Sequence, residues 1–333
     1  MERVYAELDE AEQVEVLRRV ALDAAEAFGF GVRDLTLVLH GFNTTFALDT
    51  DDGRRLALRV NTNSQSTPAH IAAQQSWLHA LATETDVLVP DPVAAPGGGW
   101  HVAVECPIWG GPLNATVASW LDGDDVGRCD AEQAQVLGRT MAALHDHAEG
   151  FSLPPGAHLT VFDEPLCHDQ SLLEGPVPLR HGHAEVVARS LALCRRRFDE
   201  VYAGRRPIVL HGDLHGGNLK WHAGRLGVFD LDDAGFGVPA LDLAISTFYL
   251  RDGEPAVEEA LRQGYAEVRA LPDVSDEQFE ALVAARQLLL ANSLLLSSTA
   301  SLREEATAYL DVTVERLSGW LHTGRFERSP AAG

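Results

Sequence analysis

The first third of the chain alternates hydrophobic and polar positions in a way that predicts one helix followed by a small antiparallel sheet. The helix is expected over residues 10–28. Residues 34–60 follow a period of two, which is typical of strands with one buried face, and Asp51, Asp52 and Gly53 mark a hairpin turn within them. Two further strands are expected over residues 87–93 and 100–105, joined by a turn at Pro96 to Gly99.

A second helix is predicted to begin at Thr67 and Pro68, because these residue types are favoured at an N-cap and at the first helical position. Beyond it, the segment CPIWGGP at residues 106–112 breaks the pattern and is predicted to be a hinge. The chain then becomes mainly helical. Helices are expected over residues 115–121, 131–147, 184–202, 256–269, 276–297 and 303–321.

The length and hydrophobic content predict two lobes. A chain of 333 residues that is 46% hydrophobic exceeds one ordinary compact domain without reaching three. We therefore expect an α+β fold, with a small N-terminal lobe over residues 1–105, a hinge over 106–112, and a larger, mainly helical lobe over 113–333.

The charge narrows the range of partners. The 49 acidic and 26 basic residues give a formal charge of −23, which repels nucleic-acid backbones and anionic lipid surfaces. No apolar run approaches the roughly 20 residues that span a bilayer, and the acidic start does not resemble a secretion signal. We expect a cytoplasmic protein that acts without nucleic acid or membrane, as a monomer or a homodimer.

The four cysteines do not suggest a metal site or a disulfide framework. Cys106, Cys129, Cys167 and Cys194 are scattered, with no C-x-x-C spacing. Reduced, structural cysteines fit this distribution better than disulfides or zinc ligands.

One short β-rich segment, residues 208–231, interrupts the helical part. An apolar strand over residues 208–210 runs into a polar loop over residues 211–218. A turn at Ala223 and Gly224 then leads to a second apolar strand, which ends at Asp230. The segment therefore presents a polar loop and a strand end beside each other.

The polar residues of this segment match the needs of phosphoryl transfer, which requires a carboxylate near the acceptor hydroxyl and oxygen ligands for Mg²⁺. Asp213 is the candidate acceptor-side base, Asn218 a neutral metal ligand and Asp230 a charged one. Each of these alone is most simply a turn residue. Their spacing, the flanking strands and the helical surroundings together favour the chemical interpretation.

At this point the sequence resembles a known family. HGDLHGGN at residues 211–218 and VFDLDD at 228–233 resemble the catalytic loop and metal-binding element of the phosphotransferase enzyme family, which includes aminoglycoside phosphotransferases, type II homoserine kinases and stress-response kinases. SWLDG at 119–123, LGRTMAALHDHA at 137–148 and Gly264-Tyr265 extend the resemblance over most of the chain.

The resemblance implies a two-lobed, protein-kinase-like fold with ATP and Mg²⁺ as cofactors and a small-molecule hydroxyl as acceptor. It places His211 with Asp213 in the catalytic site, mainly to hold the loop, and makes Asp242 a structural acidic residue that supports that loop. His145 and His147 are expected to belong to the surface or packing of their helix.

The nucleotide side is assigned by the same resemblance. The strand LALR at residues 56–59 resembles the V-A-I-K strand of kinases, so Ala57 would lie beneath the adenine and Arg59 would reach the phosphates. Gln74 stands where the helix is expected to supply a Glu. Gln74 can hydrogen-bond Arg59 but cannot neutralise its charge.

Two further contacts to ATP are expected. Residues 41–45, including Gly41 and Asn43, would cover the phosphates, although a plain hairpin turn explains this segment equally well. The backbone from Glu105 to Ile108 would contact the adenine.

The acceptor stays open at the level of sequence. An amino alcohol such as homoserine, an aminoglycoside, a sugar and a protein Ser or Thr are all candidates. Only eleven residues separate Asp230 from Asp242 and there is no A-P-E motif, which favours a small metabolite over a protein. Gln74 beside Arg59 motivates the alternative of a nucleotide-binding pseudokinase with a regulatory role.

Overall fold

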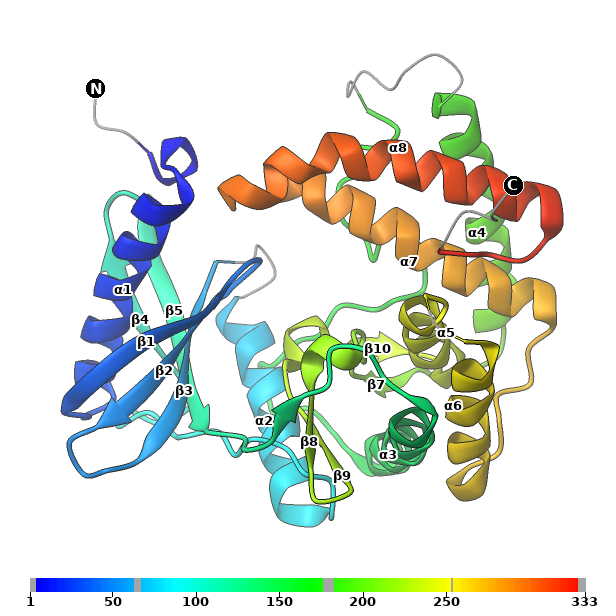
Figure 1. Cartoon of the computed structure of the whole chain (residues 1–333). Coiled ribbons are helices and arrows are strands. Elements are labelled where there is room, and N and C mark those ends of the chain that lie inside the picture. The colour runs from blue at the N-terminus through cyan, green and yellow to red at the C-terminus, as the bar shows by residue number, and fades with distance from the viewer. Residues whose placement is uncertain (1–3, 63–66, 176–182, 253, 329–333) are drawn as a thin grey trace.

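The computed structural model describes residues 4–62, 67–175, 183–252 and 254–328 (Figure 1). The hydrophobic side chains of these residues form two separate cores. One core joins an antiparallel sheet to the N-terminal helix, and the larger one fills the helical part. This arrangement confirms the predicted α+β class, with a sheet-containing lobe followed by a larger helical lobe.

The sheet has five strands in the order β1-β2-β3-β5-β4, and all neighbouring strands are antiparallel. Helix α1 packs on it through Leu17, Val20 and Ala24. The elements of this lobe are η1 (Tyr5–Glu7), α1 (Glu10–Ala27), β1 (Val32–His40), β2 (Thr44–Thr50), β3 (Arg55–Asn61), β4 (His101–Cys106) and β5 (Gly111–Ser119).

Strand β5 corrects two predictions. Residues 115–121 were expected to be helical, but Ala115 and Val117 point into the sheet's core and pair with β3, so the period is two. The predicted hinge at residues 106–112 contains the turn between β4 and β5, which belong to one sheet. The chain leaves the sheet only after Ser119. We therefore predict that the boundary between the lobes lies there.

Helix α2 (Pro68–Glu84) begins as predicted, with the Thr67 hydroxyl accepting a hydrogen bond from the amide of His70. Its Trp77 and Leu81 are fully buried in the larger core rather than in the core of the sheet. The strand predicted over residues 87–93 is wrong, because this segment makes only isolated bridges.

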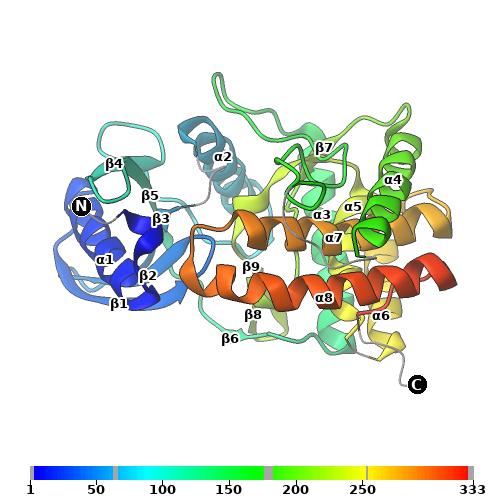
Figure 2. The same cartoon turned by 90° about the horizontal axis from the view of Figure 1, so that it is seen from above.

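The remaining predicted helices are confirmed to within a few residues, and the sequence analysis missed α5. Figures 1 and 2 show α7 and α8 lying along each other across the larger lobe. The elements are β6 (Asp124–Asp125), α3 (Ala131–Gly150), α4 (His183–Tyr202), β7 (Ile208–Leu210), η2 (Gly216–Asn218), β8 (Leu219–His222), β9 (Arg225–Val228), η3 (Leu231–Asp233), β10 (Gly235–Gly237), α5 (Pro239–Leu250), α6 (Pro255–Val268), α7 (Asp276–Leu296) and α8 (Ala300–Thr323).

Helix α7 passes a length and composition test for a membrane span, contrary to the sequence analysis. However, 72% of its apolar stretch is buried inside the protein. Its hydrophobic side chains belong to the larger core, so α7 has the burial of a core helix.

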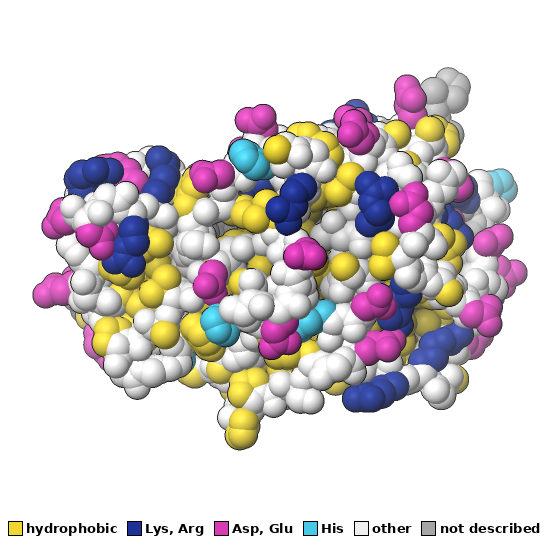
Figure 3. Space-filling view, turned by 90° about the horizontal axis from the view of Figure 1, so that it is seen from below, with side chains coloured by type: hydrophobic (Ala, Val, Ile, Leu, Met, Phe, Trp, Pro, Cys, Tyr) yellow, Lys and Arg dark blue, Asp and Glu magenta, His cyan; other side chains and the backbone are white. Residues whose placement is uncertain are grey.

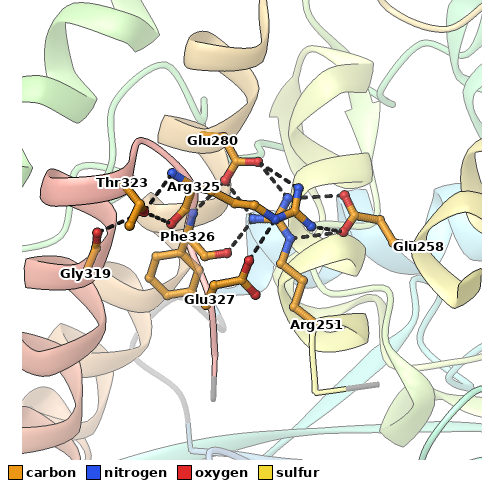
Figure 4. A network of polar contacts seen from close by, with 8 residues as sticks. All are labelled: Arg251, Glu258, Glu280, Gly319, Thr323, Arg325, Phe326 and Glu327. Atoms are coloured by element: carbon orange, nitrogen blue, oxygen red, sulfur yellow. Dashed lines mark hydrogen bonds and ion pairs between the residues drawn. The ribbon is translucent and has the colours of Figure 1, made fainter. Parts of the chain in front are cut away.

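A buried ion-pair network fixes α7 to its neighbours (Figure 4). Arg251, which follows α5, donates two hydrogen bonds of 2.7 Å to the Glu280 carboxylate on α7 and two of 3.1 Å to Glu258 on α6. It also donates to the backbone carbonyl of Phe326, at 2.6 Å. The side chain of Arg251 is 2% exposed, so the two carboxylates compensate a charge that water hardly reaches.

The turn between α7 and α8 joins the two lobes. Gln13 of α1 is fully buried; its amide donates to the carbonyl of Ser298 and accepts from the amide of Ala300, both at 3.2 Å. The hydroxyl of Thr299 donates to the carbonyl of Gly41 at 2.5 Å. One short turn therefore contacts both α1 and the loop between β1 and β2.

The surface shows how the large acidic charge is distributed. On the face in Figure 3, acidic, basic and hydrophobic side chains are interspersed, with no continuous field of one sign. All four cysteines are free.

Helices α3 and α6 pack closely where Gly138 of α3 and Gly264 of α6 face the backbone of the other helix. This close packing generates a prediction. A Cβ at Gly264 would overlap the backbone carbonyl of Gln135, so Gly264→Ala should destabilise the protein by about 1–3 kcal/mol through overpacking. Gly319→Ala on the exposed face of α8 is the matched control, where nothing lies within 4 Å, and should be neutral or stabilising. Urea unfolding of both variants measures the difference; equal stability would contradict the close crossing.

Candidate active site

The β-rich segment folds as the sequence predicts. Strands β8 and β9 pair across a two-residue turn in which Ala223 and Gly224 have φ values of 50° and 78°. The polar loop that follows β7 also contains Gly212, with φ of 79°, where a Cβ would overlap the carbonyl of Asp233. The chain after β9 therefore passes directly against this loop.

Asp242 of α5 holds the loop from behind. Its fully buried carboxylate accepts hydrogen bonds from the amides of His211, at 3.1 Å, and Gly212, at 2.9 Å. It also contacts Nε2 of His145 at 3.1 Å, and the other ring nitrogen of His145 lies 2.9 Å from the hydroxyl of Tyr265. Burial would raise the pKa of Asp242, but these contacts, above all the bond from His145, lower it below its usual range.

His211 also has a supporting position. Its Nε2 lies 3.1 Å from the carbonyl of Phe229, and its Nδ1 accepts a hydrogen bond from the amide of Asp213 at 3.3 Å. The ring thus ties the loop to the end of β9. Since His211 is fully buried, we regard it as a positioning residue rather than one that touches reacting atoms.

Asp213 stands at the centre of a polar cluster. Its carboxylate accepts hydrogen bonds from Nδ2 of Asn218 at 3.0 Å, from the hydroxyl of Tyr249 at 3.2 Å, and from Nη2 of Arg286. Burial would raise its pKa, but Arg286 and then His215 outweigh burial and lower the pKa to about 2. Asp213 is therefore ionised at neutral pH.

A backbone hydrogen bond brings together the two residues expected to hold Mg²⁺, Asn218 and Asp230. The amide of Phe229, next to Asp230, donates to the carbonyl of Asn218 at 3.1 Å. The Nδ2 of Asn218 is used by Asp213, while its Oδ1 accepts no hydrogen bond from the described residues. Asp230 has a left-handed backbone (φ 65°, ψ 64°).

One neutral and one charged oxygen donor suit Mg²⁺, which commonly takes few protein ligands and completes its shell with phosphate oxygens and water. Within the described residues, no group of three His, Cys, Asp or Glu side chains forms a metal site by itself. Asn218 and Asp230 thus fit a metal that arrives with a nucleotide.

Arg59 forms ion pairs with two carboxylates of the segment after β9. Its Nη1 is 2.9 Å from Oδ1 of Asp230 and also forms an ion pair with Asp232. Asn43 donates to Asp232 through its Nδ2 and accepts from the amide of Thr62 at 2.8 Å. The loop between β1 and β2 is thereby bound to the segment after β9. Asp232 was not among the site residues predicted from the sequence.

Gln74 does not contact Arg59, contrary to the expected pairing. Its Nε2 donates to the backbone carbonyl of Asp232 and lies 3.5 Å from Nε2 of His70. The charge of Arg59 is compensated instead by Asp230 and Asp232. Gln74 fixes the backbone that carries one of these carboxylates.

The expected adenine contacts divide into two groups. Ala57 lies in β3 opposite Ala47 and Ala118, on the same side of the strand as Arg59 by alternation. Glu105 and Ile108 instead belong to the β4–β5 hairpin, where the carbonyl of Ile108 accepts from the amide of Tyr5 at 3.0 Å. Because this hairpin does not link the lobes, a hinge contact there is not supported.

Beside Asp213 lies a cavity of about 510 Å³. Its polar walls include Asp233, Tyr249 and Arg286, and Asn218, Asp230 and Arg59 are not among its lining residues. Apolar side chains make up much of the rest, among them Phe42, Phe162, Leu241, Ile245, Leu289 and Leu290. Asp213 therefore lies between the residues expected to hold Mg²⁺ and a largely apolar space.

Four charged residues that line this cavity were not predicted from the sequence: Glu164, Asp169, Asp233 and Arg286. Arg286 lies within the otherwise apolar run ALVAARQLLLA of α7, and a charge at the centre of such a run was the available signal. Asp233 ends the acidic run after β9. Burial, followed by repulsion from Asp213, raises the pKa of Asp233 to about 7.

Comparison with known proteins agrees with this site. The model of the phosphotransferase enzyme family matches residues 34–277. The chain belongs to the phosphotransferase enzyme family. It is thus a phosphotransferase whose matched region spans the sheet, the polar loop over residues 211–218 and the start of α7. A search of curated proteins found no significant match.

Solved structures share the fold. A microcompartment-associated aminopropanol kinase is 22% identical, with a TM-score of 0.73 and coverage of 95% of this chain and 100% of that one. The amicoumacin kinase hAmiN is 17% identical, with a TM-score of 0.71 and coverage of 91% and 93%. A choline/ethanolamine kinase family protein from Mesorhizobium loti is 16% identical, with a TM-score of 0.62 and coverage of 94% and 97%. At these identities the likeness concerns the fold alone.

The position of Gln74 generates a prediction. Gln74→Glu replaces a donor by a carboxylate facing the carbonyl of Asp232, in a residue only 5% exposed, and should destabilise the protein by about 1–3 kcal/mol. Gln133→Glu is the matched control, because Gln133 caps the exposed start of α3, where Glu serves as well. Chemical unfolding in the absence of nucleotide measures both. Equal stability of the two variants would contradict the assigned contact.

Proposed function

We propose that this phosphotransferase transfers the γ-phosphate of ATP to a hydroxyl of a small molecule, with Mg²⁺. The observation that carries the proposal is the placement of Asp213, which lines the cavity and is hydrogen-bonded to Asn218 at 3.0 Å. An acceptor in the cavity would thus meet a carboxylate adjacent to a metal ligand. A screen of ATP consumption over amino alcohols, aminoglycosides and sugars, with phosphorylated product followed by ³¹P NMR, tests the function directly.

In this proposal Asp213 orients the acceptor hydroxyl and receives its proton. Phosphoryl transfer passes through a loose transition state, so positioning and charge stabilisation contribute most of the catalysis. An Asp213 carboxylate that is ionised at neutral pH can accept a hydrogen bond from the hydroxyl before transfer. Its low pKa makes it a weak base, so it gains the proton only as the new oxygen–phosphorus bond forms.

Asn218 and Asp230 would hold Mg²⁺, which when bound neutralises phosphate charge. Arg59 would contact phosphate oxygens through its fork, with Asp230 and Asp232 keeping it in place. Ala57 beneath the adenine, and Gly41 and Asn43 over the phosphates, complete the proposed nucleotide side. The amicoumacin kinase of similar fold is described in complex with AMP-PNP and Ca²⁺, which supports this assignment.

Asp213→Asn should lower kcat by roughly 10² to 10⁴, the range for a positioned acid–base group, and leave the KM for ATP nearly unchanged. The physical reason is that an amide cannot receive the hydroxyl proton. Asp199→Asn, at an exposed position of α4, controls for the loss of one carboxylate. A folded Asp213→Asn enzyme with wild-type turnover would remove Asp213 from the mechanism.

Asp230→Ala should abolish the magnesium-dependent part of ATP binding, because Asp230 is the only charged ligand assigned to the metal. The measurement is the rise in melting temperature with ATP, in the presence of Mg²⁺ or of EDTA. Wild type should show a larger rise with Mg²⁺ than with EDTA, and the variant should show the same rise in both. A magnesium-dependent rise equal to that of wild type contradicts the assignment.

A further inference from the structure

Arg286 is a buried cation whose hydrogen-bonding capacity is only partly used. Its side chain is 5% exposed, and Nη2 donates to Asp213 and, at 2.9 Å, to the hydroxyl of Tyr249. Nε is buried without a partner, and Nη1 forms no hydrogen bond with any described residue. Buried donors of a charged group are normally satisfied, so free donors beside a cavity indicate a partner that occupies it.

The volume and lining of the cavity indicate the size and polarity of that partner. Its volume of about 510 Å³ lies within the roughly 300–1,000 Å³ of sites for drug-sized ligands. Its walls are largely apolar, and Arg286 is the only Lys or Arg among the described residues that line it. A short amino alcohol would leave much of this apolar surface without contact, whereas an acceptor with a hydrocarbon or aromatic portion would cover it.

The charges around Arg286 determine which polar group fits. Asp213 already pairs with Nη2, and the Asp233 carboxyl forms no hydrogen bond among the described residues. Because the pKa of Asp233 is raised to about 7, a large share of it is protonated at neutral pH. Glu164 and Asp169 also line the cavity, and the Glu164 carboxylate accepts hydrogen bonds from the backbone amides of Leu166 and His168. The preference for an anion therefore comes from the free donors of the Arg286 guanidinium and not from the net charge of the cavity.

We infer that Arg286 determines acceptor specificity by binding a carboxylate of the acceptor, which is a hydroxy acid with an apolar body. This inference rests on the proposed function. Nη2 of Arg286 touches Asp213, where the acceptor hydroxyl is placed, and Nη1 belongs to the same guanidinium. The carboxylate must then lie within a few bonds of the phosphorylated hydroxyl. Asp213 binds the hydroxyl and Arg286 binds the carboxylate, and these two groups lie close together in the acceptor.

Matched pairs of acceptors that differ only in this charge test the inference. Three acids (3-phenylserine, 3-hydroxyoctanoate and L-threonine) are compared with their primary carboxamides in ATP-dependent phosphorylation by the full chain. Wild type should prefer at least one acid over its amide by roughly 10- to 100-fold in kcat/KM, the range for a hydrogen bond to a charged group, and mainly through KM. The two acids with larger apolar bodies should be used better than L-threonine.

Variants assign the preference to Arg286. Arg286→Gln should bring the ratio of acid to amide close to one, although it also lowers turnover by removing a partner of Asp213. Tyr249→Phe is the control, since it removes a neutral hydrogen bond to Asp213 and one acceptor of Arg286 but keeps the guanidinium, and it should lower both members of a pair equally. Arg286→Lys should retain a reduced preference, and it replaces the Gln variant if melting shows that the latter is unfolded.

Different failures have different meanings. Equal use of acids and amides by wild type, or an unchanged ratio in Arg286→Gln, overturns the carboxylate assignment. Phosphorylation of amino alcohols or aminoglycosides, which carry no carboxylate, in preference to every acid does the same and leaves the proposed function in place. No phosphorylated product from any acid, amide, amino alcohol, aminoglycoside or sugar overturns the proposed function itself.

Discussion

A carboxylate that water cannot reach must be compensated inside the protein, and the groups that compensate Asp242 are those that build the active site. Its oxygens hold the first two amides of the catalytic loop, and His145 connects it to Tyr265 on α6. An uncompensated buried charge costs several kcal/mol, so helices α3, α5 and α6 cannot separate from the loop without a large loss of stability. The position of Asp213 follows from this constraint.

The catalytic segment could be predicted from the sequence because its geometry is local. The strand, loop, two-residue turn and second strand lie within about two dozen residues, and positive φ values occur at positions such as Gly212 and Gly224 where glycine tolerates them. Asp213 and Asn218 are hydrogen-bonded because they are five residues apart in one loop. The helix cap at Thr67 was predictable for the same reason.

Features that depend on distant segments were not predictable in this way. Strand β5 carries helix-compatible alanines, and only its pairing with β3 and β4 makes it extended. The partner of Arg59 was sought on α2, but the fold brings Asp230 and Asp232 to it from about 170 residues further along. Arg286 meets Asp213 across 73 positions of sequence, so no local pattern joins them.

The turn between α7 and α8 connects the rim of the cavity to the sheet. Its residues Ser297 and Ser298 line the cavity, and the next residue, Thr299, is hydrogen-bonded to Gly41. The amide of Gln13 holds the same turn to α1, and α1 is packed on the sheet. Any rotation of the sheet relative to the helices is transmitted to the rim of the cavity through these few bonds. The space available to the proposed acceptor therefore depends on the orientation of the strands that face the proposed nucleotide site.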